Sequence, residues 1–428
     1  MNIEEIYKLF ITTTGISTDT RNIKPGSLFV ALKGDKFNAN TFAAEAIQKG
    51  ASYAIIDEKE HYVNERTILV QDSLRALQEL ARHHRRQLGL PVIALTGSNG
   101  KTTTKELINA VLSTRYNTTA TLGNLNNHIG VPLTLLSFTK DTEIGIVEMG
   151  ANHQKEIAEL CEIAEPNFGY ITNFGKAHLE GFGGTEGVIK GKSELYDYLS
   201  ANTHMAFVNL DDDIQNEKTK NLPRFTFSAK NYNCDLHIEK ALANPMVEIS
   251  FMGITVTSNL IGLYNAGNIS AAISMGYYFK ISPEKIKVAI EAYIPANNRS
   301  QIIESAGRQI ILDAYNANPS SMAAAIENLK GLSNNPRTAV LGDMFELGQE
   351  SHKEHANIVS IAAALPEIDF HFIGPDFFNS NAEISNLSFY KTFEDFKDSG
   401  AGKLPLNGTL LIKGSRGMAL ERVLEILE

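Results

Sequence analysis

From residue 91 onward the sequence alternates short apolar runs with longer stretches of helical periodicity. The first run, Pro91 to Leu95, leads into a turn containing Gly97 and Gly100 and then a helical pattern from Thr102. Six further runs of strand length follow: Gly145 to Glu148, Phe168 to Thr172, Met205 to Leu210, Gln309 to Ala314, Thr338 to Leu341 and Thr409 to Lys413, with a shorter one at His371 to Ile373. Strands separated by helices pair in parallel and are buried on both faces. The pattern therefore predicts an α/β protein.

Length and pattern together predict three domains, because 428 residues exceed what one ordinary hydrophobic core holds. They are an N-terminal α/β domain at 1–88, a central domain with a phosphate-binding loop and a parallel sheet at 89–297, and a Rossmann-like α/β domain at 298–428. Expected strands of the first are Ser27 to Ala31, Ala54 to Ile56 and Thr67 to Val70, and expected helices are Thr41 to Lys49 and Ser73 to Arg86. In the third, ligands should gather at the carboxyl ends of the strands.

Four further local features complete this outline. Leu236 to Leu260 is rich in β-forming residues and predicts an antiparallel insertion, and Pro295 to Arg299 predicts a linker. Helices are expected at Ser320 to Lys330 and Gly417 to Leu427. The basic cluster His83 to Arg86 is interpreted as an exposed helix end, where cations are favoured.

Composition narrows the class of partner. The net charge of -10 argues against a nucleic-acid or acidic-membrane partner. Cys161 and Cys234 are too far apart and too few for a disulfide framework or a zinc site. The acidic N-terminus lacks the features of a signal peptide, and no apolar run reaches the length that spans a bilayer. We expect a cytoplasmic protein. A monomer is also expected, although no pattern in the sequence bears on oligomeric state.

The turn after the first strand has the character of a phosphate-binding loop. Its candidate nucleotide-binding residues are Gly97, Ser98, Asn99, Gly100, Lys101, Thr102 and Thr103. Backbone N–H groups at a helix N-terminus cradle phosphates, while the lysine neutralises them and a threonine hydroxyl reaches Mg²⁺. The strict pattern requires glycine where this chain has Leu95, and a Gly-Lys pair that merely opens a helix is the alternative. The strand before the loop favours nucleotide binding.

A Mg²⁺ ion bound to such a loop needs oxygen ligands from elsewhere in the chain. Glu148 ends a predicted parallel strand and is the candidate, although a strand-end carboxylate can also be a solvated charge. His178 follows another strand end, and Lys190 and Lys192 begin a helical stretch. Each of these three alone is more typical of a structural or surface position.

Together these residues resemble the Mur ligases, which add amino acids to the peptidoglycan precursor and are related to folylpolyglutamate synthase. The family's TG-x-NGKT loop matches residues 96–102, its strand-end glutamate matches Glu148, and its metal-binding histidine matches His178. Its carbamoylated lysine resembles Lys192, with Lys190 as the alternative. The resemblance implies ATP, two Mg²⁺ ions held by Thr102, Glu148, His178 and Lys192, and a carbamate on Lys192.

Two further segments extend the resemblance to the nucleotide. Gly262 to Ala272 resembles the segment near adenine, keeping Asn265 and Asn268 but with Tyr264 where histidine is usual. Arg299 resembles the arginine that reaches the ATP phosphates, and Asp313 the aspartate that holds the ribose. The residues implied in catalysis are Lys101, His178, Lys192 and Arg299.

The two ends of the chain bear on the substrates. Residues 17–34 look like the UDP-sugar-binding module shared by the third and fourth ligases of the pathway, and the D-N-P-R motif usual in the diaminopimelate-adding enzyme is missing. Residues 123–132, 148–153, 313–322, 341–348 and 413–418 resemble the fourth ligase instead. The substrate-binding residues implied are Ser17, Thr18, Asp19, Arg21, Asn126, Asn127, Asn316, Asn318, Asp343, Ser415 and Arg416.

The resemblance implies an ATP-dependent ligase of peptidoglycan synthesis. A tripeptide carboxylate on UDP-MurNAc-tripeptide would take the γ-phosphoryl group of ATP, and the amine of D-Ala-D-Ala would attack the acyl phosphate. The protein would position the reactants and neutralise charge, with His178 a neutral metal ligand rather than a base. The alternatives are a third-step ligase adding another amino acid to UDP-MurNAc-dipeptide, and a nucleotide-binding relative without ligase activity.

Overall fold

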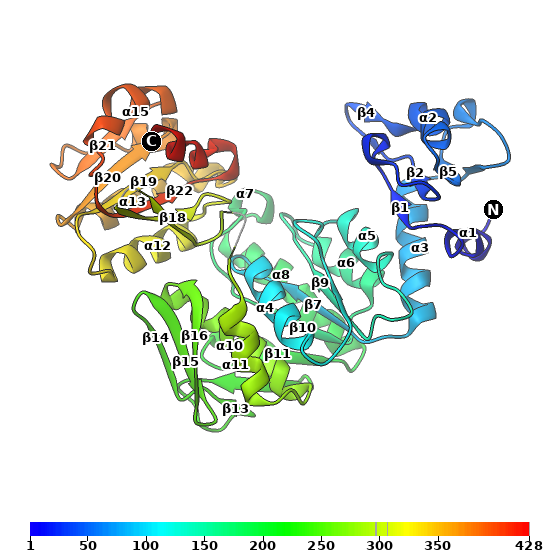
Figure 1. Ribbon diagram of the computed structural model, residues 1–428, viewed down its shortest axis with the longest axis horizontal. Coiled ribbons are helices and arrows are strands. Elements are labelled where there is room, and N and C mark those ends of the chain that lie inside the picture. Colours follow the sequence, from blue (N-terminus) through cyan, green and yellow to red (C-terminus); the bar gives the residue numbers. More distant parts are fainter. Residues whose placement is uncertain (296–297, 306, 428) are drawn as a thin grey trace.

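The computed structural model describes residues 1–295, 298–305 and 307–427, and it confirms the α/β class. Figure 1 shows three sheet-containing regions in an arc, with the N-terminal region at one end, the C-terminal region at the other and the central region between and below them. Each sheet takes its strands from a single predicted segment. The exact boundaries stay predictions, and the linker expected at Pro295 to Arg299 includes residues 296–297, which lie outside the described residues.

The N-terminal region is a small parallel sheet with helices around it. Its strands, in the order β1-β2-β5-β6, are β1 (Ile16–Ser17), β2 (Leu28–Val30), β5 (Tyr53–Ile56) and β6 (Thr67–Leu69). A hairpin of β3 (Lys33–Gly34) and β4 (Phe37–Asn38) and the helices α1 (Ile3–Phe10) and α2 (Ala43–Gln48) complete it. The apolar runs expected at the three longer strands are confirmed, and their side chains are largely buried.

Helix α3 (Ser73–Leu88) joins this region to the central one. It starts at Asp72, whose side chain accepts from the backbone N–H of Arg75, and ends at Gly89, whose φ of 64° an L-residue rarely adopts. Its apolar face packs against α5 (Gly130–Leu135) and α6 (Glu156–Ala164). The helix therefore lies within the hydrophobic core of the central region as well as its own.

The prediction that the basic end of α3 is exposed is confirmed for Arg86 but wrong for His84 and Arg85. His84 and Arg85 are buried, with Arg85 only 7% exposed. The guanidinium of Arg85 donates to the carbonyl oxygen of Ala164 at 3.1 Å and to the side-chain oxygen of Asn167 at 2.7 Å. Glu165 O also accepts from Arg85, so α3 supplies a donor to two backbone carbonyls at the end of α6 and to the Asn167 side chain beyond it.

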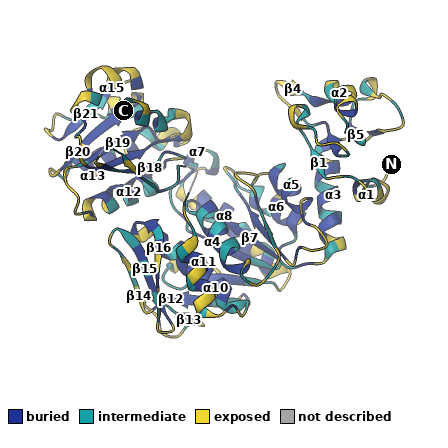
Figure 2. Ribbon diagram, viewed as in Figure 1, coloured by how far each residue is buried: buried dark blue, intermediate teal, exposed yellow. Residues whose placement is uncertain are grey.

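The central sheet has seven parallel strands in the order β13-β12-β11-β10-β7-β9-β8. They are β7 (Val92–Thr96), β8 (Thr118–Ala120), β9 (Ile144–Glu148), β10 (Phe168–Ile171), β11 (Met205–Asn209), β12 (Arg224–Ser228) and β13 (Leu236–His237). Alternate side chains of β7 face opposite layers: Val92 packs toward α3, α5, α6 and α8 (Thr185–Ala201), and Ile93 toward α4 (Lys101–Leu112), α10 (Ala266–Tyr278) and α11 (Pro283–Ala292). Figure 2 shows this sheet as a buried layer between two layers of helices.

The antiparallel insertion is confirmed in its main part. Strands β14 (Lys240–Ala243), β15 (Met246–Phe251) and β16 (Ile254–Ile261) form a three-stranded antiparallel sheet. The insertion starts later than predicted, because β13 pairs in parallel with β12 and belongs to the main sheet.

The C-terminal sheet has six strands in the order β17-β18-β22-β19-β20-β21. They are β17 (Gln301–Ser305), β18 (Arg308–Asp313), β19 (Arg337–Gly342), β20 (Ile368–Ile373), β21 (Leu387–Tyr390) and β22 (Gly408–Lys413), and only β17 runs antiparallel to its neighbour. The helices are α12 (Pro319–Gly331), α13 (Ser351–Ala363), α14 (Pro375–Asn379) and α15 (Phe393–Ser399).

The α-helix expected at Gly417 to Leu427 is wrong. That segment forms 3₁₀ turns at Arg416–Met418 and Leu420–Ile426, separated by Ala419 at φ 49°. In a 3₁₀ helix, side chains three residues apart lie above one another, and Leu420 and Val423 use this spacing to fill the core under β22.

Within the described residues, no helix is both long and apolar enough to cross a membrane.

The variant Arg85→Met tests the buried connection between α3 and α6. It should lower the free energy of unfolding by about 3 kcal/mol, because it leaves buried carbonyl oxygens without a donor. The matched control is Arg86→Met, which removes an exposed ion pair with Glu165 and should lower stability by less than about 1 kcal/mol. Urea unfolding followed by circular dichroism measures both. Equal effects of the two substitutions would contradict a buried role for Arg85.

Candidate functional site

Three neighbouring parallel strands bring the candidate residues to one sheet edge. β7 lies between β9 and β10, with Leu95 opposite Glu148 and Thr96 opposite Ile171. The segments that follow these strands are the phosphate loop, the stretch after Glu148 and the stretch after Ile171. They leave the sheet at its carboxyl edge, which is where open α/β sheets bind ligands.

Two glycines give the loop its shape. Gly97 has φ 141°, and a Cβ there would lie 1.9 Å from Thr172 Oγ1. Gly100 has φ 79°, and a Cβ there would lie 2.7 Å from Asn268 Oδ1. Both positions exclude a side chain on backbone and steric grounds. Helix α4 then starts at Lys101, so its first N–H groups point into the loop.

The stretch after β10 holds the middle of the loop. Asn99 O accepts from Thr172 Oγ1 at 2.6 Å and from Asn173 Nδ2 at 3.0 Å, and Asn99 N donates to Asn173 Oδ1 at 3.2 Å. Ser98 Oγ donates to Gly175 O at 2.6 Å. The loop is therefore held in position by bonds that leave the N–H groups of the helix start available to a ligand.

Lys101 lies within this loop and donates from Nζ to Gly97 O at 2.8 Å. Burial lowers the pKa of Lys101, and the positive charge of Arg299 lowers it further, while Glu148 opposes the shift. A desolvated ammonium bonded to a neutral carbonyl is poorly compensated. An anionic ligand such as a phosphate would supply that compensation.

Glu148 is the strand-end carboxylate that the sequence predicts beside the loop. It is 1% exposed, and its Oε1 accepts from Asn126 Nδ2 at 2.7 Å. Its Oε2 is buried and has no hydrogen-bond partner among the described residues. A buried, unpartnered carboxylate oxygen requires a cause, and a hard cation is one. Together with the Thr102 hydroxyl in the same cavity, this donor set fits Mg²⁺.

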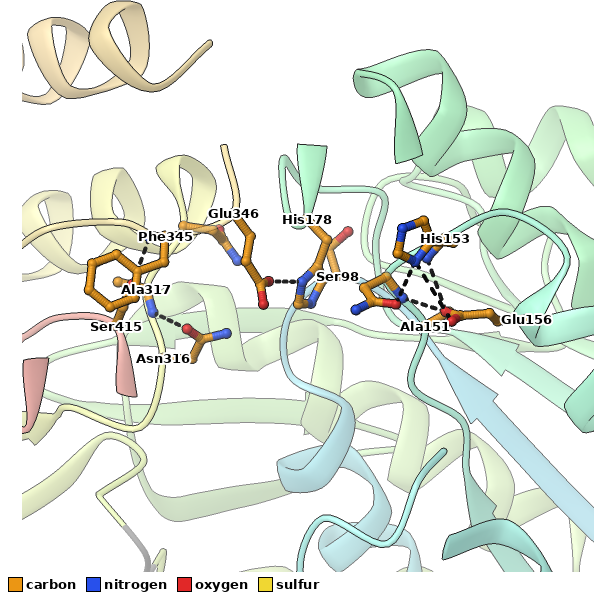
Figure 3. Close-up of polar contacts among 12 residues, drawn as sticks. Ser98, Ala151, His153, Glu156, His178, Asn316, Ala317, Phe345, Glu346 and Ser415 are labelled. Atoms are coloured by element: carbon orange, nitrogen blue, oxygen red, sulfur yellow. Dashed lines mark hydrogen bonds and ion pairs between the residues drawn. The ribbon is translucent and has the colours of Figure 1, made fainter. Parts of the chain in front are cut away.

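His178 approaches the site from the other side, just before α7 (Leu179–Phe182), with φ 53°. Its Nδ1 is hydrogen bonded to the Glu346 carboxylate of the C-terminal region, as Figure 3 shows. The described residues contain no group of three His, Cys, Asp or Glu side chains arranged around one point for a metal. A complete ligand set therefore needs oxygen atoms from another source.

Lys192 lies on α8 and contacts Ala151, which lines the cavity. It is 0% exposed, its Nζ donates to Ala151 O at 3.0 Å, and it lies 4.9 Å from the centroid of the Phe182 ring. Burial holds the pKa of Lys192 well below its ordinary value, and the charge of Lys101 adds to the shift. Lys190, the alternative, is exposed. Of the two, Lys192 is the amine next to the site.

The segment expected near adenine braces α4 and also borders the cavity. Thr104 Oγ1 donates to Asn268 Oδ1 at 3.0 Å, and Asn268 Nδ2 donates to Asn265 Oδ1 at 2.8 Å. Tyr264 stands where the family usually has histidine, and its hydroxyl is 3.0 Å from Ser300 Oγ. The tyrosine thus links the central region to the start of the C-terminal one.

Arg299 and Asp313 border the same cavity from the C-terminal side. The Arg299 guanidinium lies 3.6 Å from the centroid of the Tyr315 ring, which holds it by a cation–π contact. Asp313 Oδ2 accepts from Lys413 Nζ at 2.6 Å, and its Oδ1 accepts from Ser300 N at 3.1 Å. Lys413 is only 2% exposed, so this is a largely buried ion pair.

These residues meet around one cavity of about 790 Å³ between the central and C-terminal regions. The predicted site residues that line it are Ser98, Asn99, Gly100, Lys101, Thr102, Thr103, Asn126, Asn127, Glu148, His178, Asn265, Asn268, Arg299, Asp313, Asn316 and Asn318. Its volume suits a nucleotide-sized ligand together with part of a second molecule. The cavity thus combines a phosphate loop, a carboxylate with a free oxygen and residues of a second domain.

Comparison with known proteins agrees with this architecture. Three family models match: "Mur ligase family, catalytic domain" at residues 12–85, "Mur ligase middle domain" at 95–276 and "Mur ligase, glutamate ligase domain" at 298–396. The UDP-N-acetylmuramoyl-tripeptide–D-alanyl-D-alanine ligase of Bacillus subtilis is 34% identical, over 96% of this chain and 93% of the relative. The chain belongs to the Mur ligase family.

Solved structures of Mur ligases have the same fold over nearly the whole chain. A crystal structure of MurF from Acinetobacter baumannii superposes with a TM-score of 0.86 at 32% identity, covering 96% of this chain and 92% of that one. MurF from Thermotoga maritima, solved in complex with ADP, gives a TM-score of 0.86 at 28% identity, covering 98% and 97%. The three-domain architecture expected from the sequence is confirmed.

Three residues of this Mur ligase that the sequence singled out for substrate contact lie outside the cavity lining, in the C-terminal domain. Asp343 is fully buried, and its carboxylate accepts from the backbone N–H groups of Asp376 and Phe377, both at 2.9 Å, at the start of α14. Ser415 Oγ accepts from Phe345 N at 2.9 Å. Asp343 and Ser415 thus make contacts within their own domain, and substrate contact by either residue stays a prediction. Arg416 is exposed and pairs with Glu421.

The four candidates for the UDP-sugar lie in the N-terminal domain, away from this cavity. Ser17 Oγ donates to Asp19 O at 3.2 Å, and Arg21 pairs with the Asp19 carboxylate at 2.8 Å, which lowers the pKa of Asp19 to about 2. Thr18 lies between them and is partly exposed. Their role in substrate binding stays a prediction.

Several residues that the sequence left unassigned belong to the site. Asn173 holds the loop, Tyr315 holds Arg299, and Lys413 holds Asp313. Asn173 and Lys413 each stand at or just after a strand end, so the rule that pointed to Glu148 and Asp313 applies to them as well. Tyr315 also follows a strand end, but an aromatic ring at such a position is usually a packing residue, so it was not singled out.

The Asp313–Lys413 pair makes an asymmetric prediction. Asp313→Asn should destabilise the C-terminal domain by about 3 kcal/mol, because it leaves the buried Lys413 ammonium without its counter-charge. Lys413→Met should cost about 1 kcal/mol, because Asp313 is partly exposed and keeps the Ser300 N–H bond. Urea unfolding of both variants and of the double variant measures the coupling. Additive effects in the double variant would contradict a direct pair.

Proposed function

We propose that this chain joins D-alanyl-D-alanine to UDP-N-acetylmuramoyl-tripeptide, with ATP converted to ADP and phosphate, as a step of peptidoglycan precursor synthesis. The observation that carries the proposal is the shared cavity, in which the phosphate loop and Glu148 of the central domain face Asn316 and Asn318 of the C-terminal domain. Family membership and near full-length similarity to proteins named for this activity support it.

The phosphate loop would bind ATP with its γ-phosphoryl group directed into the cavity. Lys101 and Arg299 carry the positive charge that developing phosphoryl oxygens need, and both border the same space. Asn265, Asn268 and Asp313 line the side where the base and ribose would lie. A carboxylate is a poor electrophile, and transfer of the phosphoryl group to it gives an acyl phosphate with a good leaving group.

Thr102, Glu148, His178 and the modified Lys192 would hold two Mg²⁺ ions, which supply charge neutralisation on the phosphates. The free Oε2 of Glu148 supports this role. The neutral form of Lys192, favoured by burial, is a nucleophile for carbon dioxide. Its Nζ forms a bond to the carbon of CO₂ and releases a proton, leaving a carbamate whose two oxygens bear the negative charge. The carbamate oxygens would complete the set of ligands for Mg²⁺ near His178.

The C-terminal domain would position the incoming amine. Asn316 and Asn318 line the cavity from the C-terminal domain, and Asn318 forms the N-cap of α12 beside Asn99 of the phosphate loop. The residues Ser17, Thr18, Asp19 and Arg21 would bind the UDP-sugar on the N-terminal domain, leaving the peptide to extend into the cavity. Both reactants then meet where water is limited by the surrounding domains.

A coupled ADP-release assay tests the function directly. ADP should appear only when ATP, Mg²⁺, UDP-MurNAc-tripeptide and D-Ala-D-Ala are all present, and the product should contain the pentapeptide by mass spectrometry. UDP-MurNAc-dipeptide with L-lysine or diaminopimelate is the comparison, and turnover there instead would identify a third-step ligase. ATP binding without turnover of any pair would identify a nucleotide-binding protein that is not a ligase.

Lys192→Ala tests the carbamate. The variant should lose at least 100-fold in kcat and regain activity with short-chain carboxylic acids, which place a carboxylate in the vacated space. Lys190→Ala is the matched control and should turn over at the wild-type rate, because Lys190 is exposed. Thermal unfolding of Lys192→Ala checks that the fold is intact. Wild-type turnover by a folded Lys192→Ala variant would exclude the carbamate.

A further inference from the structure

The segment Asp343 to Gly348 is firmly anchored within the C-terminal domain. Asp343 caps α14 with both carboxylate oxygens, and Ser415 N donates to Asp343 O at 3.2 Å. Phe345 N donates to Ser415 Oγ at 2.9 Å (Figure 3). The residues before Glu346 are thus bonded to two different elements of their own domain, so the position of Glu346 follows that of the domain.

From this anchor the segment reaches the central domain at His178. Glu180 N donates to Glu346 O at 3.2 Å, and the Glu346 carboxylate is hydrogen bonded to His178 Nδ1. Gly348, at φ 55°, lies so close that a Cβ there would be 3.1 Å from the Glu180 side chain. Figure 3 shows the two side chains pointing toward each other from different domains.

This contact has a defined chemical consequence for the imidazole. A carboxylate accepts only, so His178 Nδ1 must carry the proton, and in the neutral ring the lone pair is then on Nε2. Histidines that bind metals commonly donate their other N–H to a carboxylate, which fixes both tautomer and ring orientation. His178 borders the cavity that holds Glu148.

We propose that Glu346 is a positioning residue that the C-terminal domain supplies to the central domain, fixing the Nδ1–H tautomer and the ring orientation of His178. His178 Nε2 then faces a metal only while the two domains are docked. The inference rests on the proposed function, in which His178 holds a metal ion. It makes the domain contact a condition for assembling the catalytic centre.

Other contacts of the same interface hold the two domains in this relative position. Asn99 and Asn318 exchange amide hydrogen bonds of 2.7 and 3.4 Å, which connect the phosphate loop to the start of α12. Lys176 N donates to Ser320 Oγ at 2.9 Å, and Lys176 Nζ pairs with Glu354 at 2.6 Å. Glu346 is therefore not needed to hold the domains together, and its half-exposed carboxylate contributes little to stability.

The experiment measures the imidazole directly by NMR of ¹⁵N-histidine-labelled protein, free of metal and substrates, at mildly alkaline pH. Comparison with His178→Gln assigns the His178 ring. The wild-type ring should be the Nδ1-protonated tautomer, Glu346→Ala should convert it to a mixture dominated by the Nε2-protonated form, and Glu346→Gln should keep the wild-type tautomer through its amide oxygen. Lys176→Gln, which removes the Lys176–Glu354 ion pair, is the matched control and should leave the His178 ring unchanged.

Kinetics of the same variants complete the test. Glu346→Ala should lower kcat and raise the Mg²⁺ concentration for half-maximal activity, each by about 10- to 100-fold, with the KM for ATP nearly unchanged. Glu346→Gln should recover most of the loss. If Glu346→Ala has the same His178 tautomer as the wild type, the proposal is overturned. It is also overturned if Lys176→Gln changes the tautomer equally, because the effect would then come from loosening the domain interface in general. Glu346→Gln as inactive as Glu346→Ala, with Mn²⁺ binding by EPR also lost, would overturn it in favour of Glu346 as a metal ligand.

The tautomer readout separates this inference from the proposed function. A wild-type protein without ligase activity, but with the expected tautomers, would refute the proposed reaction and retain the positioning contact. If the wild-type protein has ligase activity but the His178 tautomer is the same with and without the Glu346 carboxylate, the proposed reaction is retained and the positioning contact is refuted.

Discussion

The parallel pairing of three strands in the central sheet is the constraint on which the site depends. Because β9 and β10 flank β7 in fixed register, Glu148 lies opposite Leu95 and Ile171 lies opposite Thr96. The loop after β7 must therefore pass directly beside Thr172, which leaves no room for a side chain at Gly97. The same register places the Glu148 carboxylate next to the loop that would bind the phosphates, so one backbone arrangement fixes both halves of the phosphoryl-transfer site.

Buried charge gives that arrangement its preference for ligands. Lys101 and Lys192 are both desolvated amines with lowered pKa values, and each donates to a backbone carbonyl rather than to a carboxylate. Glu148 is the buried carboxylate near Lys101, and one of its oxygens has no partner among the described residues. Such a set is poorly compensated when nothing is bound. Phosphate groups, a divalent cation and a carbamate would balance it, and these are the groups that the proposed reaction brings together.

The features predictable from sequence were those set by local chemistry. Strand ends at Glu148 and Asp313, the turn at Gly97 and the helix from Lys101 depend on apolar periodicity and on residues nearby in the chain. The predictions were wrong where contacts with residues distant in sequence determine burial or helix type. Arg85 is buried because carbonyl oxygens around residue 165 need a donor, and residues 417–427 form 3₁₀ turns because the core under β22 favours spacing of three. Neither requirement is visible in the local pattern.

Resemblance between motifs points to segments, whereas the contacts that each residue within a segment makes are visible only in the fold. Asp343, Glu346 and Ser415 come from two such segments, and the sequence assigned substrate contact to the first and the last. In the fold, Asp343 and Ser415 hold the chain in place, while Glu346, which had no assigned role, reaches the neighbouring domain at His178. A polar residue that anchors a loop and one that acts through it are alike in sequence. They are told apart only by whether their polar atoms are already bonded inside their own domain.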